Sequence, residues 1–237
     1  MKTDIEIADY IDKQENSPYS LLYQQFLSLL LSGDRHGASS LILNQVESGT
    51  PVKDIYLHVF QASQYEIGRL WEINRISVAQ EHFCTAATQL VMSQLYSHVF
   101  STEKTGYRMI AASIGGELHE IGIRMVADFF EMAGWDTYYM GANTPTDTII
   151  QAIRSLKTDL LALSVSMPFN LNDVVGVIRR VHEELADSNI KILVGGRPFN
   201  VSRDLWTKVG ADGYAPNAEE AIIVADRLIK KLHDSEE

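Results

Sequence analysis

Three short segments of this chain combine residue types that can bind a small molecule. The first holds His119 two residues after Glu117, the second holds Ser164 and Ser166, and the third is the glycine pair Gly195–Gly196. Near neutral pH a histidine can act as an acid, a base or a ligand. Hydroxyls donate and accept hydrogen bonds, and glycines let a backbone approach a ligand closely. The three segments are therefore candidates for one binding site, provided that the fold brings them together.

The second half of the chain has patterns that alternate between strand and helix. Short apolar runs predict strands at 107–113, 136–140, 159–165, 190–194 and 211–214. Helical patterns lie between and after them at 121–133, from Thr144 and Pro145 onwards, at 172–186 and at 218–232. The residues 141–145 are expected to form a turn in which Thr144 caps the next helix. This alternation predicts a five-stranded, parallel, doubly wound sheet of the flavodoxin-like type.

In such sheets ligands bind beyond the carboxyl ends of the strands, where the strand order reverses. In the five-stranded form that point lies between the first and third strands. The three candidate segments follow the first, third and fourth strands, so we expect them to converge there. A phosphoacceptor site is excluded because Ser113 and Ser164 stand where acidic residues would be needed. The glycines lack the dinucleotide spacing G-x-G-x-x-G, and there is no Walker loop.

The first half of the chain predicts helices at 18–32, 34–46, 51–71 and 77–100. Asp34 is expected to cap the second helix and Thr50 the third, while Ser77 and Gln80 have the spacing of a capping box. Short turns join the four helices, which indicates a small bundle. The predicted domains are an N-terminal extension (1–17), a four-helix bundle (18–100), a linker (101–106) and an α/β domain (107–237).

The three segments resemble the signature of cobalamin-binding domains, which is D-x-H-x-x-G, then S-x-L, then G-G. Here it appears as Glu117-Leu-His119-Glu-Ile-Gly122, Ser164-Val-Ser166 and Gly195-Gly196, with intervals within the family ranges. Two positions depart from the signature, because Glu117 replaces Asp and Ser166 replaces Leu.

The resemblance implies that His119 is the lower axial ligand of cobalt, displacing the base of the cofactor itself. Glu117 would fix the histidine tautomer and raise its basicity. The displaced nucleotide tail would lie in a slot beside the sheet, where Ser164 offers a hydroxyl and the two glycines allow close approach. The alternative for the serines and glycines is that they serve only the strand ends and the turn.

A second resemblance lies in the bundle. Trp71 is followed nine residues later by Glu81-His82, a pattern similar to the bundle of light-responsive cobalamin regulators. There the tryptophan packs over the upper axial group of adenosylcobalamin, and the Glu-His pair shapes the pocket. Position 72 is Glu rather than the His common in light-sensing members. Trp71 could instead be a core aromatic and His82 a surface residue. The other histidines have no partner pattern: His36, His58, His98, His182 and His233.

These resemblances lead to two hypotheses. The first is a sensory and regulatory protein without enzymatic activity, an adenosylcobalamin-dependent photoreceptor that signals through a partner protein or a change of oligomeric state. The alternative is a corrinoid carrier subunit of a methyltransferase system, for which methylcobalamin would be the cofactor. A pocket reused for another tetrapyrrole is a third possibility.

Composition limits the partners and the location. The chain has 31 Asp and Glu against 20 Lys and Arg, a net charge of −11, which disfavours binding to nucleic acid phosphates. Its single cysteine, Cys84, excludes a disulfide framework. No apolar run reaches membrane-spanning length, and the N-terminus lacks the pattern of a signal peptide. We therefore expect a cytoplasmic protein that makes no contact with membranes. The resemblance to the cobalamin regulators further implies a homo-oligomer of two or more copies.

Overall fold

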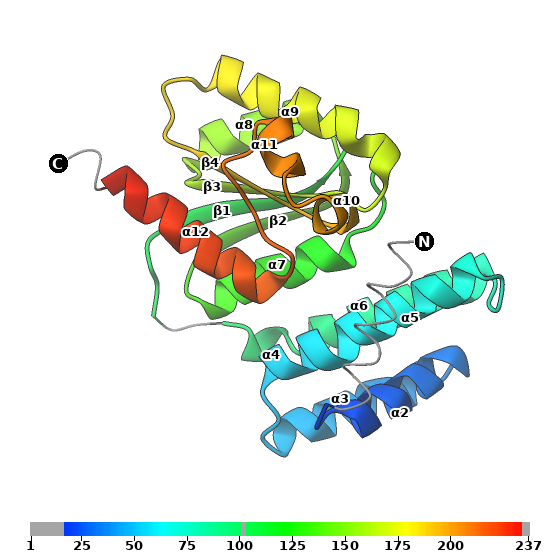
Figure 1. Ribbon diagram of the computed structural model, residues 1–237. Helices are drawn as coiled ribbons and strands as arrows, with labels where there is room; N and C mark the ends of the chain where they lie inside the picture. The colour runs from blue at the N-terminus through cyan, green and yellow to red at the C-terminus, as the bar shows by residue number, and fades with distance from the viewer. Residues whose placement is uncertain (1–16, 101–102, 234–237) are drawn as a thin grey trace. The chain divides into compact units, whose positions relative to one another are not determined.

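The computed structural model describes residues 17–100 and 103–233, which fall into two compact units divided between Val99 and Phe100. The N-terminal unit is helical and the C-terminal unit contains the sheet (Figure 1). The predicted N-terminal extension, 1–17, lies outside the described residues except for Ser17, as do residues 101–102 of the predicted linker. In the part of the chain that the structure describes, no helix is long and apolar enough to cross a membrane.

The helical unit is built from α2 (Ser20–Leu31), α3 (Arg35–Glu47), a long composite helix and α6 (Val78–Gln94). The composite helix runs through α4 (Val52–Ile55), the π-helical turn η1 (Tyr56–Phe60) and α5 (Gln61–Glu72). After α6 comes the 3₁₀ turn η2 (Tyr96–His98). Aromatic rings fill the core of this unit: Phe60 packs against Phe26 and Tyr56 with ring centroids 5.3 and 5.2 Å apart.

Two of the predicted helix caps are confirmed. The Asp34 carboxylate accepts a hydrogen bond from the Gly37 amide, and Ser77 and Gln80 form a reciprocal capping box. The predicted caps Thr50 and Thr144 are wrong. In both cases the following proline is itself the extended N-cap residue, because its fixed φ suits the position just before the helix. Residues 141–144, predicted as part of a turn, instead continue the second strand.

The second unit contains five parallel strands: β1 (Arg108–Ile114), β2 (Asp136–Thr144), β3 (Leu160–Ser164), β4 (Lys191–Gly195) and β5 (Gly213–Tyr214). Their order is β2-β1-β3-β4-β5, so the chain reverses direction across the sheet between β1 and β3. The predicted fold class, a helical region followed by a doubly wound parallel sheet, is confirmed.

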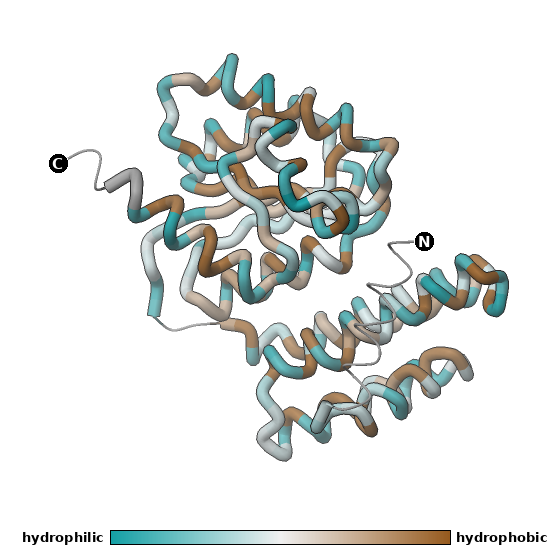
Figure 2. Tube along the Cα trace, viewed as in Figure 1, coloured by the Kyte–Doolittle hydropathy of each residue, from teal (hydrophilic) through white to brown (hydrophobic). Residues whose placement is uncertain are grey.

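Helices cover both faces of the sheet (Figure 1). One face carries α7 (Ile121–Met132) and α12 (Ala218–His233), and the other carries α8 (Thr146–Leu156) and α9 (Leu171–Glu184). The short turn η3 (Pro168–Asn170) precedes α9, and the short helices α10 (Arg197–Val201) and α11 (Leu205–Val209) follow β4. Figure 2 shows hydrophilic and hydrophobic residues mixed along the outer helices, as expected for helices with one buried side.

The two faces differ in the size of their side chains. The core beneath α8 and α9 is formed mainly by isoleucine, valine and leucine. The core beneath α7 and α12 includes six alanines, among them Ala111, Ala162 and Ala225. Because side chains alternate along a strand, the next residues on this second face after Ala111 and Ala162 are Ser113 and Ser164. The carboxyl end of this face is therefore lined by small side chains.

The turn after β4 needs glycine at position 196. Gly196 has a φ of +103°, and a Cβ atom added there would lie 2.0 Å from the carbonyl oxygen of Val165. Any larger residue must push the β3 and β4 loops apart or adopt a strained backbone.

We predict that Gly196→Ala lowers the free energy of unfolding by at least about 2 kcal/mol, through strain and overpacking. Urea denaturation measures this change. Gly176→Ala is the matched control, because a Cβ there would meet no atom within 4 Å and the residue lies inside α9. That substitution should stabilise the helix by up to about 1 kcal/mol. Equal effects of the two substitutions would contradict the interpretation of the turn.

Candidate functional site

The centre of the candidate site is the carboxylate of Glu117, whose side chain is 1% exposed. Glu117 lies in the loop between β1 and α7. One oxygen, Oε1, is 2.5 Å from His119 Nδ1 and accepts a hydrogen bond from the His119 amide at 3.2 Å. The other, Oε2, accepts hydrogen bonds from the amides of Ser166 and Met167 and from the side chain of Asn170, at 2.9, 3.1 and 3.2 Å. A single buried carboxylate therefore joins the loops after β1 and β3.

These contacts determine the charge of Glu117. Burial raises the pKa of its carboxyl, but hydrogen bonds from His119 and from the amides of Ser166 and Met167 outweigh burial and lower the pKa to about 2. Since an ionised carboxylate only accepts hydrogen bonds, His119 Nδ1 must carry the proton. The second ring nitrogen, Nε2, is then the one with a lone pair, which is the form in which a histidine binds a metal.

The loop that carries His119 is also fixed at its backbone. The Ser113 hydroxyl donates to the carbonyl oxygen of His119 at 2.8 Å. From the end of β2, the amide of Asn143 donates to the Glu117 carbonyl and its side chain accepts from the Gly116 amide, both at 2.8 Å. The side chain of His119 is 57% exposed. The structure thus presents an imidazole of defined tautomer at the surface of an anchored loop.

The serine and glycine segments lie in one row of the sheet. Ser113 is aligned with Ser164, and Ser164 with Gly195, across β1, β3 and β4. The Ser164 hydroxyl makes no hydrogen bond within the described ranges, whereas Ser166 contributes its amide to Glu117. Gly122 lies in the first turn of α7, where an added Cβ would meet nothing within 4 Å. The structure therefore places Glu117 and His119 together with Ser164, Ser166 and Gly195 at the carboxyl ends of the central strands.

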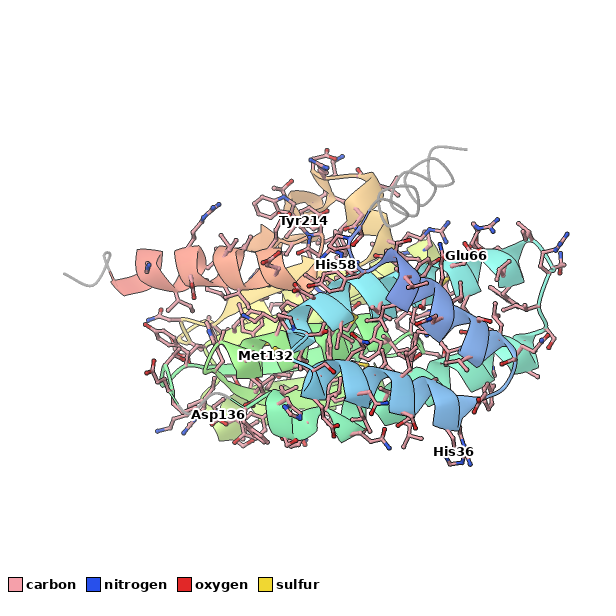
Figure 3. The ribbon with its side chains drawn as sticks, turned by 90° about the horizontal axis from the view of Figure 1, so that it is seen from below. His36, His58, Glu66, Met132, Asp136 and Tyr214 are labelled. Atoms are coloured by element: carbon pink, nitrogen blue, oxygen red, sulfur yellow. The ribbon has the colours of Figure 1, made fainter. Side chains whose placement is uncertain are left out.

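Three further predicted residues belong to the helical unit. Trp71 lies at the end of α5 and is 46% exposed, so the alternative interpretation as a core aromatic is not what the structure shows. Glu81 Oε2 is 2.6 Å from His82 Nδ1, and Glu81 Oε1 accepts a hydrogen bond from Thr85 at 3.0 Å. The cofactor contacts of these three residues stay a prediction. His36 and His58 lie on α3 and η1 of the same unit (Figure 3), and His58 stacks on Tyr19.

Sequence reasoning missed Asn143, Asn170 and Met167, which hold Glu117 in place. All three act through contacts between segments far apart in the chain, and Met167 acts only through its backbone. Sequence reasoning also missed an open groove of about 530 Å³ beside the N-termini of α8 and α9. That groove touches Gly115 and Gly116 of the His119 loop but none of the predicted site residues.

A single imidazole supplies one ligand, so a metal bound at His119 needs its other ligands from another molecule, such as a tetrapyrrole macrocycle. The small residues beside His119 fit a cofactor that needs space at the edge of the sheet. The row across β1, β3 and β4 has no bulky side chain, because it consists of Ser113, Ser164 and Gly195. The first turn of α7 has no side chain at Gly122. The class of protein follows from three features taken together. Cobalamin-binding proteins combine a helical unit, a doubly wound sheet and a histidine that a carboxylate orients at the switch point of the sheet.

Comparisons with known proteins agree. Two family models described as B12 binding domain match residues 22–96 and 107–223. Dimethylamine corrinoid protein 3 of Methanosarcina mazei is 30% identical over 122 residues, which cover 51% of this chain and 71% of the relative. Dimethylamine corrinoid protein 1 of Methanosarcina acetivorans is 27% identical over 174 residues, covering 71% and 79%. The chain belongs to the family of B12-binding proteins, and a corrinoid of the cobalamin type is its cofactor.

A solved structure shows the same fold. The monomethylamine corrinoid protein of Methanosarcina barkeri superposes with a TM-score of 0.76 over 87% of this chain and 98% of its own, at 23% identity.

The hypothesis of an adenosylcobalamin-dependent photoreceptor with a role in regulation is wrong. The curated relatives are named as dimethylamine and trimethylamine corrinoid proteins, not as light-responsive regulators. The physical reason lies in the bundle pattern. The hypothesis rested on Trp71 at the end of α5 and on Glu81-His82 in the first turn of α6, and side chains of these types do not by themselves specify which upper axial group a cobalamin carries.

We predict that the buried Glu117 makes stability depend on pH. Because the pKa of its carboxyl is about 2 in the folded state and about 4.5 in the unfolded chain, its contribution is present above pH 4.5 and is lost as the pH falls towards 2. Unfolding by urea between pH 6 and 2.5 should show a smaller loss of stability with acidification in Glu117→Gln than in the unchanged protein. Parallel stability profiles of Glu117→Gln and the unchanged protein over this pH range would contradict the prediction.

Proposed function

We propose that the protein is a corrinoid carrier subunit, which holds a cobalamin cofactor through His119 and passes methyl groups between separate methyltransferases. The observation that carries the proposal is the Glu117–His119 pair at the switch point of the sheet. The names of the relatives, dimethylamine and trimethylamine corrinoid proteins, support the carrier assignment. On this proposal the protein is not itself an enzyme, and the form of cofactor that it works with is methylcobalamin.

The residues of the chain would have distinct tasks. A bound corrinoid supplies a cobalt atom that accepts a methyl group from a donor and gives it to an acceptor. His119 would bind the lower side of that cobalt through Nε2, while Glu117 keeps the proton on Nδ1. Ser113 and Asn143 hold the loop so that the imidazole needs little rearrangement when the cofactor binds. Ser164, Ser166, Gly122 and Gly195–Gly196 would line the space for the nucleotide tail.

We predict that His119→Ala weakens retention of methylcobalamin by at least about tenfold. The purified protein is incubated with the cofactor and desalted, and the retained cobalt is quantified together with the absorption spectrum. His182→Ala is the matched control, since His182 is an exposed residue of α9, and it should retain cofactor like the unchanged protein.

The carrier assignment itself is tested by methyl transfer. Extract of the native cells, supplied with ¹⁴C-methyl-labelled methylamines, should label the corrinoid bound to the unchanged protein but not to His119→Ala. Recovery of unlabelled adenosylcobalamin from the unchanged protein, in an extract that turns over the methylamines, would contradict the carrier function.

We also propose that Trp71, Glu81 and His82 contact the upper side of the bound cofactor. Because Trp71 is 46% exposed, Trp71→Ala should change the free energy of unfolding by less than about 1 kcal/mol while it weakens cofactor retention. Ile67, also on α5, is fully buried, so Ile67→Ala should cost about 2–5 kcal/mol. A Trp71→Ala variant that retains the cofactor normally would remove this residue from the site.

A further inference from the structure

We propose that Glu120 is a positioning residue for His119, because its side chain ties the residue after the histidine to β2. This role deepens the proposed function and rests on it for its biological consequence, since the direction of His119 matters for cobalt only if a corrinoid binds there. The contacts involved lie between the start of α7 and β2, and none of them includes the Glu117 carboxylate.

The side chain of Glu120 is used for a contact with β2 rather than for its own helix. Glu120 is the N-cap residue of α7, yet it makes no side-chain capping hydrogen bond. Its Oε2 atom instead accepts hydrogen bonds from the Tyr139 hydroxyl and the Ala142 amide, each at 3.1 Å. Burial and the charge of Glu120 raise the pKa of Tyr139, so the phenol remains a donor. The residue that follows His119 is therefore attached to the edge strand of the sheet.

The backbone of β2 is irregular where it meets Glu120. The stretch from Tyr139 to Thr144 is paired with the shorter stretch 111–114 of β1, so β2 has two more residues than its neighbour here. Extra residues of this kind form β-bulges, which interrupt the ladder and redirect the groups beside them. The irregularity thus lies at the two donors that Glu120 uses.

The bulge frees the Ala142 amide for this contact. In a parallel ladder, alternate residues of a strand donate to the neighbouring strand. The Asp136 amide donates to the backbone of Tyr107, so regular alternation would assign Ala142, six residues later, to the ladder with β1. The extra residues interrupt this alternation, and the Ala142 amide donates to the Glu120 side chain instead.

The contact also depends on glycine at position 141. Gly141 has a φ of +75°, in the left-handed region that residues with a Cβ atom rarely adopt. A Cβ atom at this position would lie 3.2 Å from Glu120 Oε2 and 3.9 Å from the hydroxyl oxygen of Tyr139. The bulge, the glycine and the two donors therefore act together to hold one carboxylate oxygen beside the histidine loop.

The hold on Glu120 acts on His119 through the backbone. Because Glu120 follows His119 directly, fixing its side chain limits the rotation of the peptide between the two residues. Glu117 contacts the imidazole ring itself, whereas Glu120 holds the backbone from which the ring extends. The two carboxylates thus constrain different parts of the same residue.

The first experiment measures order in the histidine loop without any cofactor. Amide hydrogen exchange, followed by NMR, reports how readily the amides of His119 and Ala142 open. Glu120→Ala should raise the exchange rate of both amides by at least about tenfold, because the link between the loop and β2 is lost. The Leu161 amide, in the buried strand β3, should exchange slowly in every variant and shows that the variant is folded. Unchanged exchange at His119 in folded Glu120→Ala would overturn the proposal.

The chain offers matched controls for this measurement. Glu120→Gln keeps an oxygen that can accept both hydrogen bonds, so its exchange should stay close to that of the unchanged protein. Tyr138 and Tyr139 are neighbours in β2 and each is 38% exposed, but within the described ranges the Tyr138 hydroxyl makes no hydrogen bond. Tyr139→Phe should therefore raise exchange at His119, whereas Tyr138→Phe should not. Equal effects of the two tyrosine substitutions would contradict the positioning role.

The second experiment measures the consequence for the cofactor. The proteins are loaded with methylcobalamin and desalted, and the retained cobalt is quantified. Glu120→Ala should weaken retention by about tenfold, and Tyr139→Phe should weaken it to a smaller extent. Normal retention in Glu120→Ala, despite faster exchange at His119, would remove Glu120 from the positioning of the ligand.

A double-mutant cycle separates positioning from a direct contact between Glu120 and the cofactor. Since Tyr139 acts through Glu120, adding Tyr139→Phe to Glu120→Ala should have little further effect on retention. Loss of cofactor in Glu120→Ala but not in Tyr139→Phe would assign Glu120 a direct contact and would overturn the proposal. If the exchange results are as expected but the unchanged protein retains no corrinoid, the proposed function fails while the hold of Glu120 on the histidine loop stands.

Discussion

The buried carboxylate of Glu117 is the interaction on which the rest of the site depends. An ionised group that is 1% exposed is costly unless donors surround it. The donors come from two loops that leave the sheet next to each other, one after β1 and one after β3. Only a doubly wound order, in which β1 and β3 are neighbours, places these loops side by side. The same contact that satisfies the charge therefore fixes His119, and the topology of the sheet makes the contact possible.

The sheet has a second property that bears on the cofactor. Large aliphatic side chains fill the face beneath α8 and α9, whereas the core beneath α7 and α12 combines six alanines with large side chains such as Phe130 and Trp135. The row Ser113, Ser164 and Gly195 continues this small-residue pattern to the carboxyl end of the sheet. A protein that only had to pack two helices onto a sheet would gain more from larger side chains on both faces. The Ser113 hydroxyl of this row is used within the protein, since it is buried and donates to the carbonyl oxygen of His119.

The order of the elements could be predicted well from the sequence, whereas the contacts between residues far apart in the chain could not. Alternating apolar runs and capping patterns are local properties, so the strands and the caps at Asp34 and Ser77 could be derived from short windows. Asn170 and Asn143 could not, because their partners lie 53 and 27 residues away along the chain. The π-helical turn of Tyr56–Phe60 and the helices α10 and α11 also have no clear local signal. The light-sensor hypothesis was wrong because it rested on Trp71, Glu81 and His82 alone, and three side chains of these types do not specify which group a cobalamin carries.

Glu117 shows how a departure from a family pattern can be read physically. From the sequence alone, it could not be decided whether Glu in place of Asp and Ser in place of Leu change which ligand the site binds. The structure accommodates both, because the longer side chain reaches backbone donors of Ser166 and Met167 that do not depend on side-chain identity. The negative charge beside the imidazole is thus retained and is held by donors from the loop after β3. On the carrier proposal, a histidine held in this way would offer the same ring nitrogen to a cofactor with little rearrangement, because its direction is set by contacts within the protein.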